Sequence, residues 1–127
     1  MKIRFDPQEN LVFIRAKIFG PKGRSSLLLA LDTGASSTLI SRKQLRRIGY
    51  DLAASSSRVQ MTTGSGVELV PRISVSKFST LGQERNDFSV IAHDLPPSAG
   101  IDGLLGLDFF RGQNLNIDFR NGLILLS

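Results

Sequence analysis

The sequence has no cysteine and only one histidine, His93. Without cysteine, the chain can form neither a disulfide framework nor a thiolate metal site, and it offers no thiol nucleophile. A single histidine excludes a metal site built from clustered imidazoles and makes a Ser-His-Asp triad a weak hypothesis. We expect His93 itself to be a solvated or hydrogen-bonded loop residue. These absences exclude thiol catalysis and the common histidine-rich metal sites.

Long hydrophobic runs are absent as well. No apolar stretch approaches the roughly 18 residues that a membrane span requires, and residues 1–10 lack the apolar segment of a signal peptide. We therefore expect a cytoplasmic chain, either free-standing or a soluble domain of a longer protein. A length of 127 residues, with 41% hydrophobic and 21% charged residues, is typical of one globular domain. The prediction is a single domain over residues 1–127.

The formal net charge is +5, and a basic chain can attract nucleic acid. The basic residues are scattered, however, apart from one cluster over residues 42–47 that is typical of a solvated helix face. No row of aromatic residues alternates with basic ones, as a base-stacking surface would require. We expect no nucleic-acid partner. A small basic β-barrel that binds nucleic acid is kept as an alternative, which salt-dependent oligonucleotide binding would reveal.

Alternation of apolar and polar side chains with a period of two dominates the chain and indicates β-strands. Over residues 11–18 it produces one continuously apolar face, made of Val12, Ile14, Ala16 and Ile18. Further strands are predicted, in chain order, at residues 26–31, 38–40, 58–62, 67–75, 88–92, 115–119 and 123–126.

The segments between these strands contain few helical signals. A short helix is expected over residues 42–48, and Asp108 is expected to cap a second brief helix. Residues 64–66, Gly-Ser-Gly, form a glycine-rich hairpin tip. Residues 78–87 are polar and are predicted to be a loop. The chain is thus predicted to be mostly β, with two short helices.

One acidic residue stands in an unusual place. Asp32 directly follows the apolar run over residues 26–31 and precedes Thr33, Gly34 and Ala35. A glycine here lets the backbone turn tightly and lets another chain approach it closely, while a threonine hydroxyl can hold the loop by hydrogen bonds. Taken alone, the acid could simply form an Asx turn after a strand.

A second unusual segment lies downstream, where residues 101–110 combine an apolar strand, a glycine turn and a brief helix. The Asp-Thr-Gly-Ala-Ser sequence at 32–36 resembles the active-site loop of aspartic proteases, and Leu-Leu-Gly at 104–106 resembles the second signature of that family. One such loop in a short chain is similar to the retropepsin-like, or retroviral-type, branch. The resemblance implies a mostly β, closed-barrel acid-protease fold with one or two short helices.

The resemblance implies an aspartic endopeptidase that hydrolyses peptide bonds in extended polypeptides without a metal or organic cofactor. Asp32 would be the catalytic aspartate. Thr33 would make hydrogen bonds that hold two such loops face to face, and with Gly34 and Ala35 it would support the loop. The backbone of Gly34 would also contact the substrate.

Two further groups of residues receive roles from the same resemblance. Gly64, Ser65 and Gly66 would form the tip of a flap that closes over the peptide, although an ordinary hairpin tip is an equal alternative. Leu105 and Gly106 would lie behind the active-site loop and support it.

Aspartic proteolysis needs two carboxylates, one acting as base on a water molecule and the other donating a proton to the scissile carbonyl. This chain has one suitable loop, since Asp102 is followed by Gly103 without a hydroxyl residue and Asp108 is interpreted as a helix cap. A two-fold homodimer would bring two copies of Asp32 together. The sequence therefore predicts that each chain carries half of an active site.

The sequence departs from the retroviral pattern at two positions. Ser36 and Leu107 stand where those proteases usually have an Asp and an Arg that help to lock the dimer. Dimerisation would have to rest elsewhere, and the terminal strands over residues 1–5 and 123–127 are candidates for an intersubunit sheet. The missing charges also motivate an alternative, a catalytically inactive module of the same fold that dimerises or binds peptides.

Overall fold

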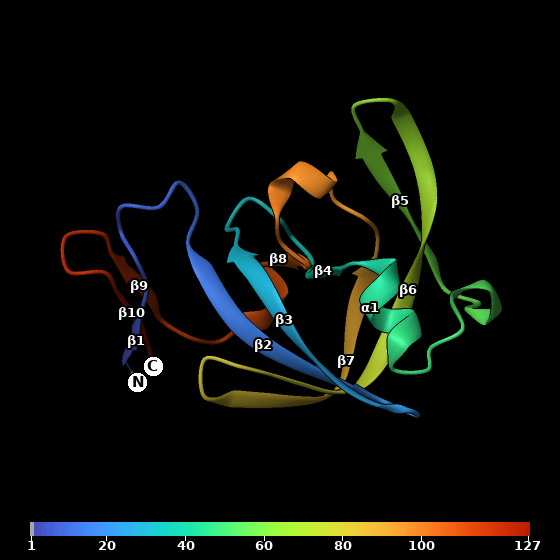
Figure 1. The fold of residues 1–127 in the computed structure, drawn as a ribbon, viewed down its shortest axis with the longest axis horizontal. Coiled ribbons are helices and arrows are strands. Elements are labelled where there is room, and N and C mark those ends of the chain that lie inside the picture. Colours follow the sequence, from blue (N-terminus) through green and yellow to red (C-terminus); the bar gives the residue numbers. More distant parts are fainter. Residues whose placement is uncertain (1) are drawn as a thin grey trace.

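The computed structural model describes residues 2–127, leaving aside the side chain of Thr63, and its centre is a closed six-stranded β-barrel (Figure 1). Neighbouring strands follow the order β2-β3-β8-β4-β7-β6, and β6 pairs back with β2 to close the barrel. The prediction of a mostly β barrel is confirmed. The barrel strands are β2 (Phe13–Gly20), β3 (Gly23–Leu31), β4 (Leu39–Ile40), β6 (Gly66–Thr80), β7 (Gln83–Ala92) and β8 (Gly103–Leu105).

The barrel interior is filled by the apolar faces that the alternation predicts. Ile14, Ala16 and Ile18 of β2 are buried, while Arg15 and Lys17 between them are exposed. Phe78 lies at the centre of an aromatic group, stacked on Phe88 with ring centroids 5.0 Å apart. Because successive side chains of a strand point to opposite faces, one apolar residue in two is enough to build this core.

Residues 78–87 correct one expectation, because they form a β-hairpin rather than a loop. β6 continues to Thr80 and β7 begins at Gln83, so that Leu81 and Gly82 make the turn with positive φ angles of 52° and 73°. The segment looks polar because its outward face meets water. Its inward face buries Phe78, and the Thr80 hydroxyl donates to the carbonyl oxygen of Arg15 at 2.7 Å.

A second hairpin extends beyond the barrel. It is made of β5 (Arg58–Thr63) and the first half of β6, and Figure 1 shows it standing clear of the other strands. The side chains of Val67 and Leu69 on this hairpin are 64% and 65% exposed. Large apolar side chains exposed side by side on a strand are typical of a surface that meets a ligand or partner.

The one α-helix of the described residues, α1 (Arg42–Arg47), agrees with the helix expected over residues 42–48. Ser41 caps it by accepting a hydrogen bond from the backbone N–H of Gln44, and Leu45 is buried against the barrel. The remaining helical segments of residues 2–127 are single 3₁₀ turns: η1 (Leu52–Ala54), η2 (Pro97–Ala99) and η3 (Leu107–Phe109). No helix among these residues is long and apolar enough to cross a membrane.

The two chain ends form a separate three-stranded sheet. β10 (Leu123–Leu126) lies between β1 (Lys2–Arg4) and β9 (Leu115–Asp118), and all three strands come from one chain. Met1, the first residue of the predicted N-terminal strand, lies outside the described residues. In the turn between β9 and β10, hydrogen bonds from the side chain and backbone of Asn121 lower the pKa of Asp118 below its usual value.

Candidate active site

Asp32 is the first residue after β3, where the chain turns away from the barrel. Its backbone N–H donates to the carbonyl oxygen of Leu105 at 2.9 Å, which continues the parallel pairing of β3 with β8. Its carboxylate Oδ1 accepts a hydrogen bond from the backbone N–H of Gly34 at 2.9 Å, and its carbonyl oxygen accepts one from Ala35 at 3.1 Å. The half-buried carboxylate is therefore oriented by the backbone of its own loop.

Gly106 packs directly behind this loop. A Cβ atom at that position would lie 2.7 Å from the carbonyl carbon of Ser37 and 2.8 Å from the carbonyl oxygen of Ala35, so no larger residue fits. The next backbone N–H, from Leu107, donates to that same Ala35 oxygen at 2.8 Å. Leu105 is fully buried in the core. The two residues predicted to support the loop are thus placed against it, while their part in activity stays a prediction.

A second support, which sequence reasoning missed, joins Thr38 to Asp108. The backbone N–H of Thr38 donates to Asp108 Oδ2 at 2.9 Å, and its hydroxyl donates to Asp108 Oδ1 at 2.7 Å. The same hydroxyl accepts the backbone N–H of Gly106 at 3.2 Å. The expectation that Asp108 caps a helix is wrong, because Gly106 occupies the cap position of η3 and makes no side-chain cap. The sequence signal for this pair is the hydroxyl residue in the apolar run Thr38–Ile40, because a hydroxyl in a buried strand needs a hydrogen-bond partner.

Both carboxylate oxygens of Asp102 also accept hydrogen bonds from the framework. Its Oδ2 accepts the backbone N–H of Leu28 at 2.8 Å, and its Oδ1 accepts the side-chain amide of Gln44 at 3.2 Å. These bonds tie β3 to α1 across the segment that leads into β8. Asp102 and Asp108 therefore hold the frame of the site, and Asp32 is the carboxylate of the loop itself.

A cleft of about 390 Å³ lies beside the loop. Its floor is mainly apolar, because Leu39, Ile91 and Leu104 come from the barrel and Met61 comes from the β5 hairpin. Its lining residues are Gly34, Ala35, Ser36, Ser37, Leu39, Gln60, Met61, Thr62, Ile91 and Leu104. The cleft therefore lies between the predicted active-site loop and the inner part of the hairpin. Asp32 does not line it, and the lining residue nearest to Asp32 in sequence is Gly34.

The other predicted site residues lie outside this lining. Thr33 is exposed on the loop. Gly64, Ser65 and Gly66 lie at the exposed tip of the hairpin, and Gly66 has a positive φ of 127°. The part of the hairpin that reaches the cleft is residues 60–62, which sequence reasoning did not select. Among the described residues, no group of three or more acidic or histidine side chains is placed to hold a metal ion.

Comparison with known proteins agrees with this geometry. A family model described as aspartyl protease matches residues 14–109, from β2 through η3. The chain belongs to the aspartyl protease family. The match includes the Asp32 loop and the Leu-Leu-Gly segment, and it leaves the terminal sheet strands outside.

Comparison with a solved structure shows which type of aspartic-protease fold the chain has. The chain is similar to a retropepsin-like aspartic protease from Rickettsia conorii, with a TM-score of 0.73 and 21% sequence identity over 100% of this chain and 89% of that one. A comparison with curated protein sequences finds no match. The retropepsin-like fold expected from the two signatures is confirmed, and family and fold together support an aspartic peptidase.

Proposed function

We propose that this aspartyl protease family member is an endopeptidase that cleaves extended polypeptides as a homodimer, with Asp32 of each subunit as the catalytic carboxylate. The observation that carries the proposal is the difference in contacts among three aspartates. Asp102 and Asp108 each bind the framework through both carboxylate oxygens, whereas Asp32 lies on the loop that borders the cleft. One chain thus supplies one reactive carboxylate.

The chemistry needs a second carboxylate, because one must take a proton from the attacking water while the other donates a proton to the scissile carbonyl oxygen. A two-fold axis beside the loop would place the second Asp32 opposite the first. In the proposed dimer, one carboxylate is ionised and the other protonated. The water oxygen adds to the carbonyl carbon to give a hydrated intermediate. The carboxyl that took the proton of water then passes it to the leaving amine as the C–N bond breaks, and a hydroxyl of the intermediate returns its proton to the other carboxylate, leaving a carboxylic acid and an amine. The Gly34 N–H holds Asp32 Oδ1 in place throughout.

The terminal sheet offers a surface through which two subunits can associate. Ser36 and Leu107 offer no charge pair to lock two subunits, and Leu107 is 38% exposed. β1 and β9 form the two outer edges of the terminal sheet among the described residues. An outer edge presents unpaired backbone groups that can bond to a strand of another chain. In the dimer we propose, these edges and the loop around Leu107 form the contact.

The cleft supports a peptide substrate with an apolar side chain. A volume of about 390 Å³ with Leu39, Met61, Ile91 and Leu104 around it accommodates one such side chain. β5 is the terminal strand of the seven-stranded sheet, so its outer edge can pair with an extended segment. Thr33 and the backbone of Gly34 are proposed to face the second subunit and the substrate, respectively.

The direct test is Asp32→Asn, which keeps the shape of the side chain and its acceptor oxygen while removing the negative charge. We expect cleavage of a peptide library at pH 3 to 7 to fall by at least about a thousandfold, with the circular dichroism spectrum and elution volume unchanged. Asp51→Asn, at an exposed acid that caps η1, is the matched control and should keep its activity. Unchanged cleavage by the Asp32→Asn protein would overturn the assignment.

An inactive module of the same fold is the second candidate, and the uncharged Ser36 and Leu107 are what favour it. It predicts that the wild-type protein cleaves no peptide even at concentrations where sizing shows a dimer. Cleavage that an aspartic-protease inhibitor of the pepstatin type blocks would eliminate this candidate.

A further inference from the structure

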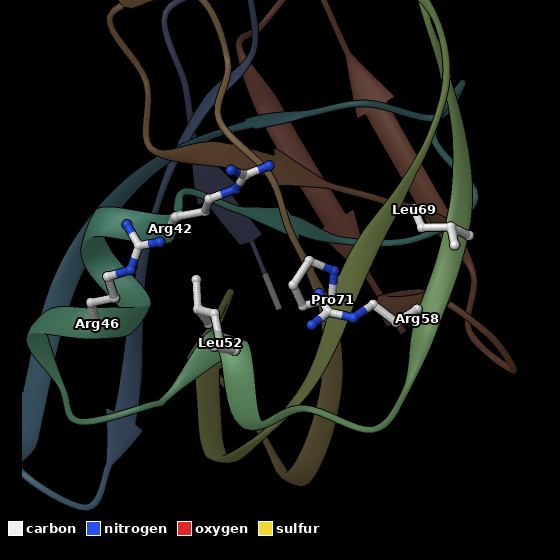
Figure 2. Close-up of a pocket in the computed structure, with 7 residues that line it drawn as sticks. Arg42, Arg46, Leu52, Arg58, Leu69 and Pro71 are labelled. Atoms are coloured by element: carbon white, nitrogen blue, oxygen red, sulfur yellow. The ribbon is translucent and has the colours of Figure 1, made fainter.

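A second concave surface lies between α1 and the base of the β5 hairpin. It encloses about 250 Å³ and brings together three arginines that are distant in sequence, Arg42 and Arg46 from α1 and Arg58 from the start of β5. Figure 2 shows their guanidinium groups around one hollow, with Leu52 and Pro71 between them. The lining, here named the arginine hollow, consists of Arg42, Arg46, Leu52, Ala53, Arg58, Leu69 and Pro71.

None of the three arginines of the hollow forms an ion pair within the described residues. The acid–base contacts there join Lys77 to Glu84 and place His93 Nδ1 3.3 Å from Glu68. The Nε atom of Arg42 is buried without a hydrogen-bond partner. The other nitrogens of a guanidinium can bind a carboxylate or phosphate through two parallel hydrogen bonds.

Two acids close to lining residues of the hollow accept hydrogen bonds from backbone N–H groups. Asp94 accepts the backbone N–H of Arg42 at 2.9 Å, and Asp51 accepts that of Ala53 at 3.1 Å. Neither of them lines the arginine hollow. Together these observations describe a cationic hollow with an apolar floor, which is the composition that suits an anionic group carried on an aliphatic stem.

The arginine hollow adjoins the proposed substrate cleft along β5. Gln60 lines the cleft and is paired with Leu69, which lines the hollow. Arg58 lies two residues before Gln60 on the same strand, so their side chains leave the same face of the hairpin about 7 Å apart. Side chains two positions apart in an extended peptide have that same spacing. An extended peptide bound beside β5 can therefore place one side chain in the cleft and another in the arginine hollow.

We propose that the arginine hollow binds an acidic side chain of the polypeptide substrate, two positions from the side chain held in the cleft. This inference deepens the proposed function and rests on it, since it names the substrate class of the same site. A glutamate fits better than an aspartate, because its longer stem can cross Leu69 and reach the guanidinium groups. Arg58 and Arg46 act here as specificity residues.

The test compares paired peptides that differ only by Glu or Gln at one position, scanned along a cleaved sequence. For the wild-type protein, we expect one position at which Glu raises kcat/KM on the order of tenfold over Gln. Arg58→Gln and Arg46→Gln should each reduce that ratio severalfold. Arg47→Gln is the matched control, because Arg47 is an exposed arginine of the same helix that does not line the hollow.

The outcomes separate this inference from the proposed function. A wild-type protein that cleaves peptides with no Glu preference at any position, or with a preference that survives both substitutions, overturns the inference and leaves the endopeptidase assignment standing. If no peptide is cleaved, the proposed function fails, and fluorescence anisotropy of the same labelled peptides still tests the hollow. Equal binding of the Glu and Gln peptides then overturns it.

A further arm distinguishes a peptide carboxylate from a free anion. Calorimetric titration with inorganic phosphate should give at most weak binding that does not compete with the Glu peptide. Tight phosphate binding that Arg58→Gln abolishes, without any Glu preference, would make the hollow a site for a small anion and would contradict the proposal. Thermal denaturation of each variant shows whether it remains folded.

Discussion

Both carboxylate oxygens of Asp108 accept hydrogen bonds from Thr38, one from its backbone N–H at 2.9 Å and one from its hydroxyl at 2.7 Å. Thr38 is fully buried and begins the segment that returns from the Asp32 loop to the barrel. Its hydroxyl also accepts the Gly106 N–H, so one side chain links both ends of the site's framework. The position of the loop therefore depends on this pair as much as on the loop's own residues.

Thr38→Val should destabilise the fold, because it removes the hydroxyl and leaves Asp108 Oδ1 and the Gly106 N–H without this partner. Loss of a hydrogen bond to a charged group costs about 1.5–3 kcal/mol of unfolding free energy, which urea denaturation can measure. Thr62→Val makes the same change at an exposed strand residue and should alter stability by less than about 0.5 kcal/mol. Equal effects at the two positions would contradict the account.

Gly106→Ala should displace the active-site loop. The added Cβ would lie 2.7 Å from backbone atoms of Ser37, which cannot move without shifting the loop. We expect a loss of about 1–3 kcal/mol of stability, together with reduced kcat because in the proposed dimer the two Asp32 carboxylates would no longer meet correctly. Gly64→Ala adds the same methyl where nothing lies within 4 Å, and its stability should stay at the wild-type value. A fully stable and active Gly106→Ala protein would refute this packing argument.

Ile91→Ala should change which side chain the cleft prefers. Ile91 forms part of the apolar floor, and shortening it enlarges the space available to the substrate. Rates on peptides with Val, Leu or Phe at the scanned position should shift towards Phe by about tenfold, given about 1–3 kcal/mol for each methylene group matched or lost. Val67→Ala, on the hairpin but outside the cleft, should leave the order of preference intact. An unchanged order in the Ile91→Ala protein would place the substrate elsewhere.

Sequence patterns predict a mostly β chain, most of its strands and the helix after Ser41, because each depends on local alternation or capping. The closed barrel is what the resemblance to aspartic proteases implies. The patterns missed the hairpin of β6 and β7, since Phe78 and Thr80 are buried by pairing with β2, a strand about sixty residues earlier in the chain. The loop carrying Asp32 was predicted from its motif and from the Leu-Leu-Gly segment that packs behind it.

The features that sequence reasoning could not reach are all long-range contacts. Thr38 and Asp108 are seventy residues apart, so a helix cap was the nearest local explanation for the acid. The sequence pattern predicts that Arg42 and Arg46 belong to a solvated helix face. Their role changes only because the fold places Arg58 of the β5 hairpin on the other side of the hollow. Local propensity carries no information about such partners.

The central claim, that two chains each contribute one Asp32 to a shared site, is tested most directly by mixing wild-type protein with the Asp32→Asn protein and allowing subunits to exchange. If both carboxylates are needed, an equal mixture retains about one quarter of the activity of the same total amount of wild-type protein, because only wild-type pairs are active. If each chain works alone, the mixture retains about one half. Activity that falls with the square of the wild-type fraction supports the account, and a linear fall contradicts it.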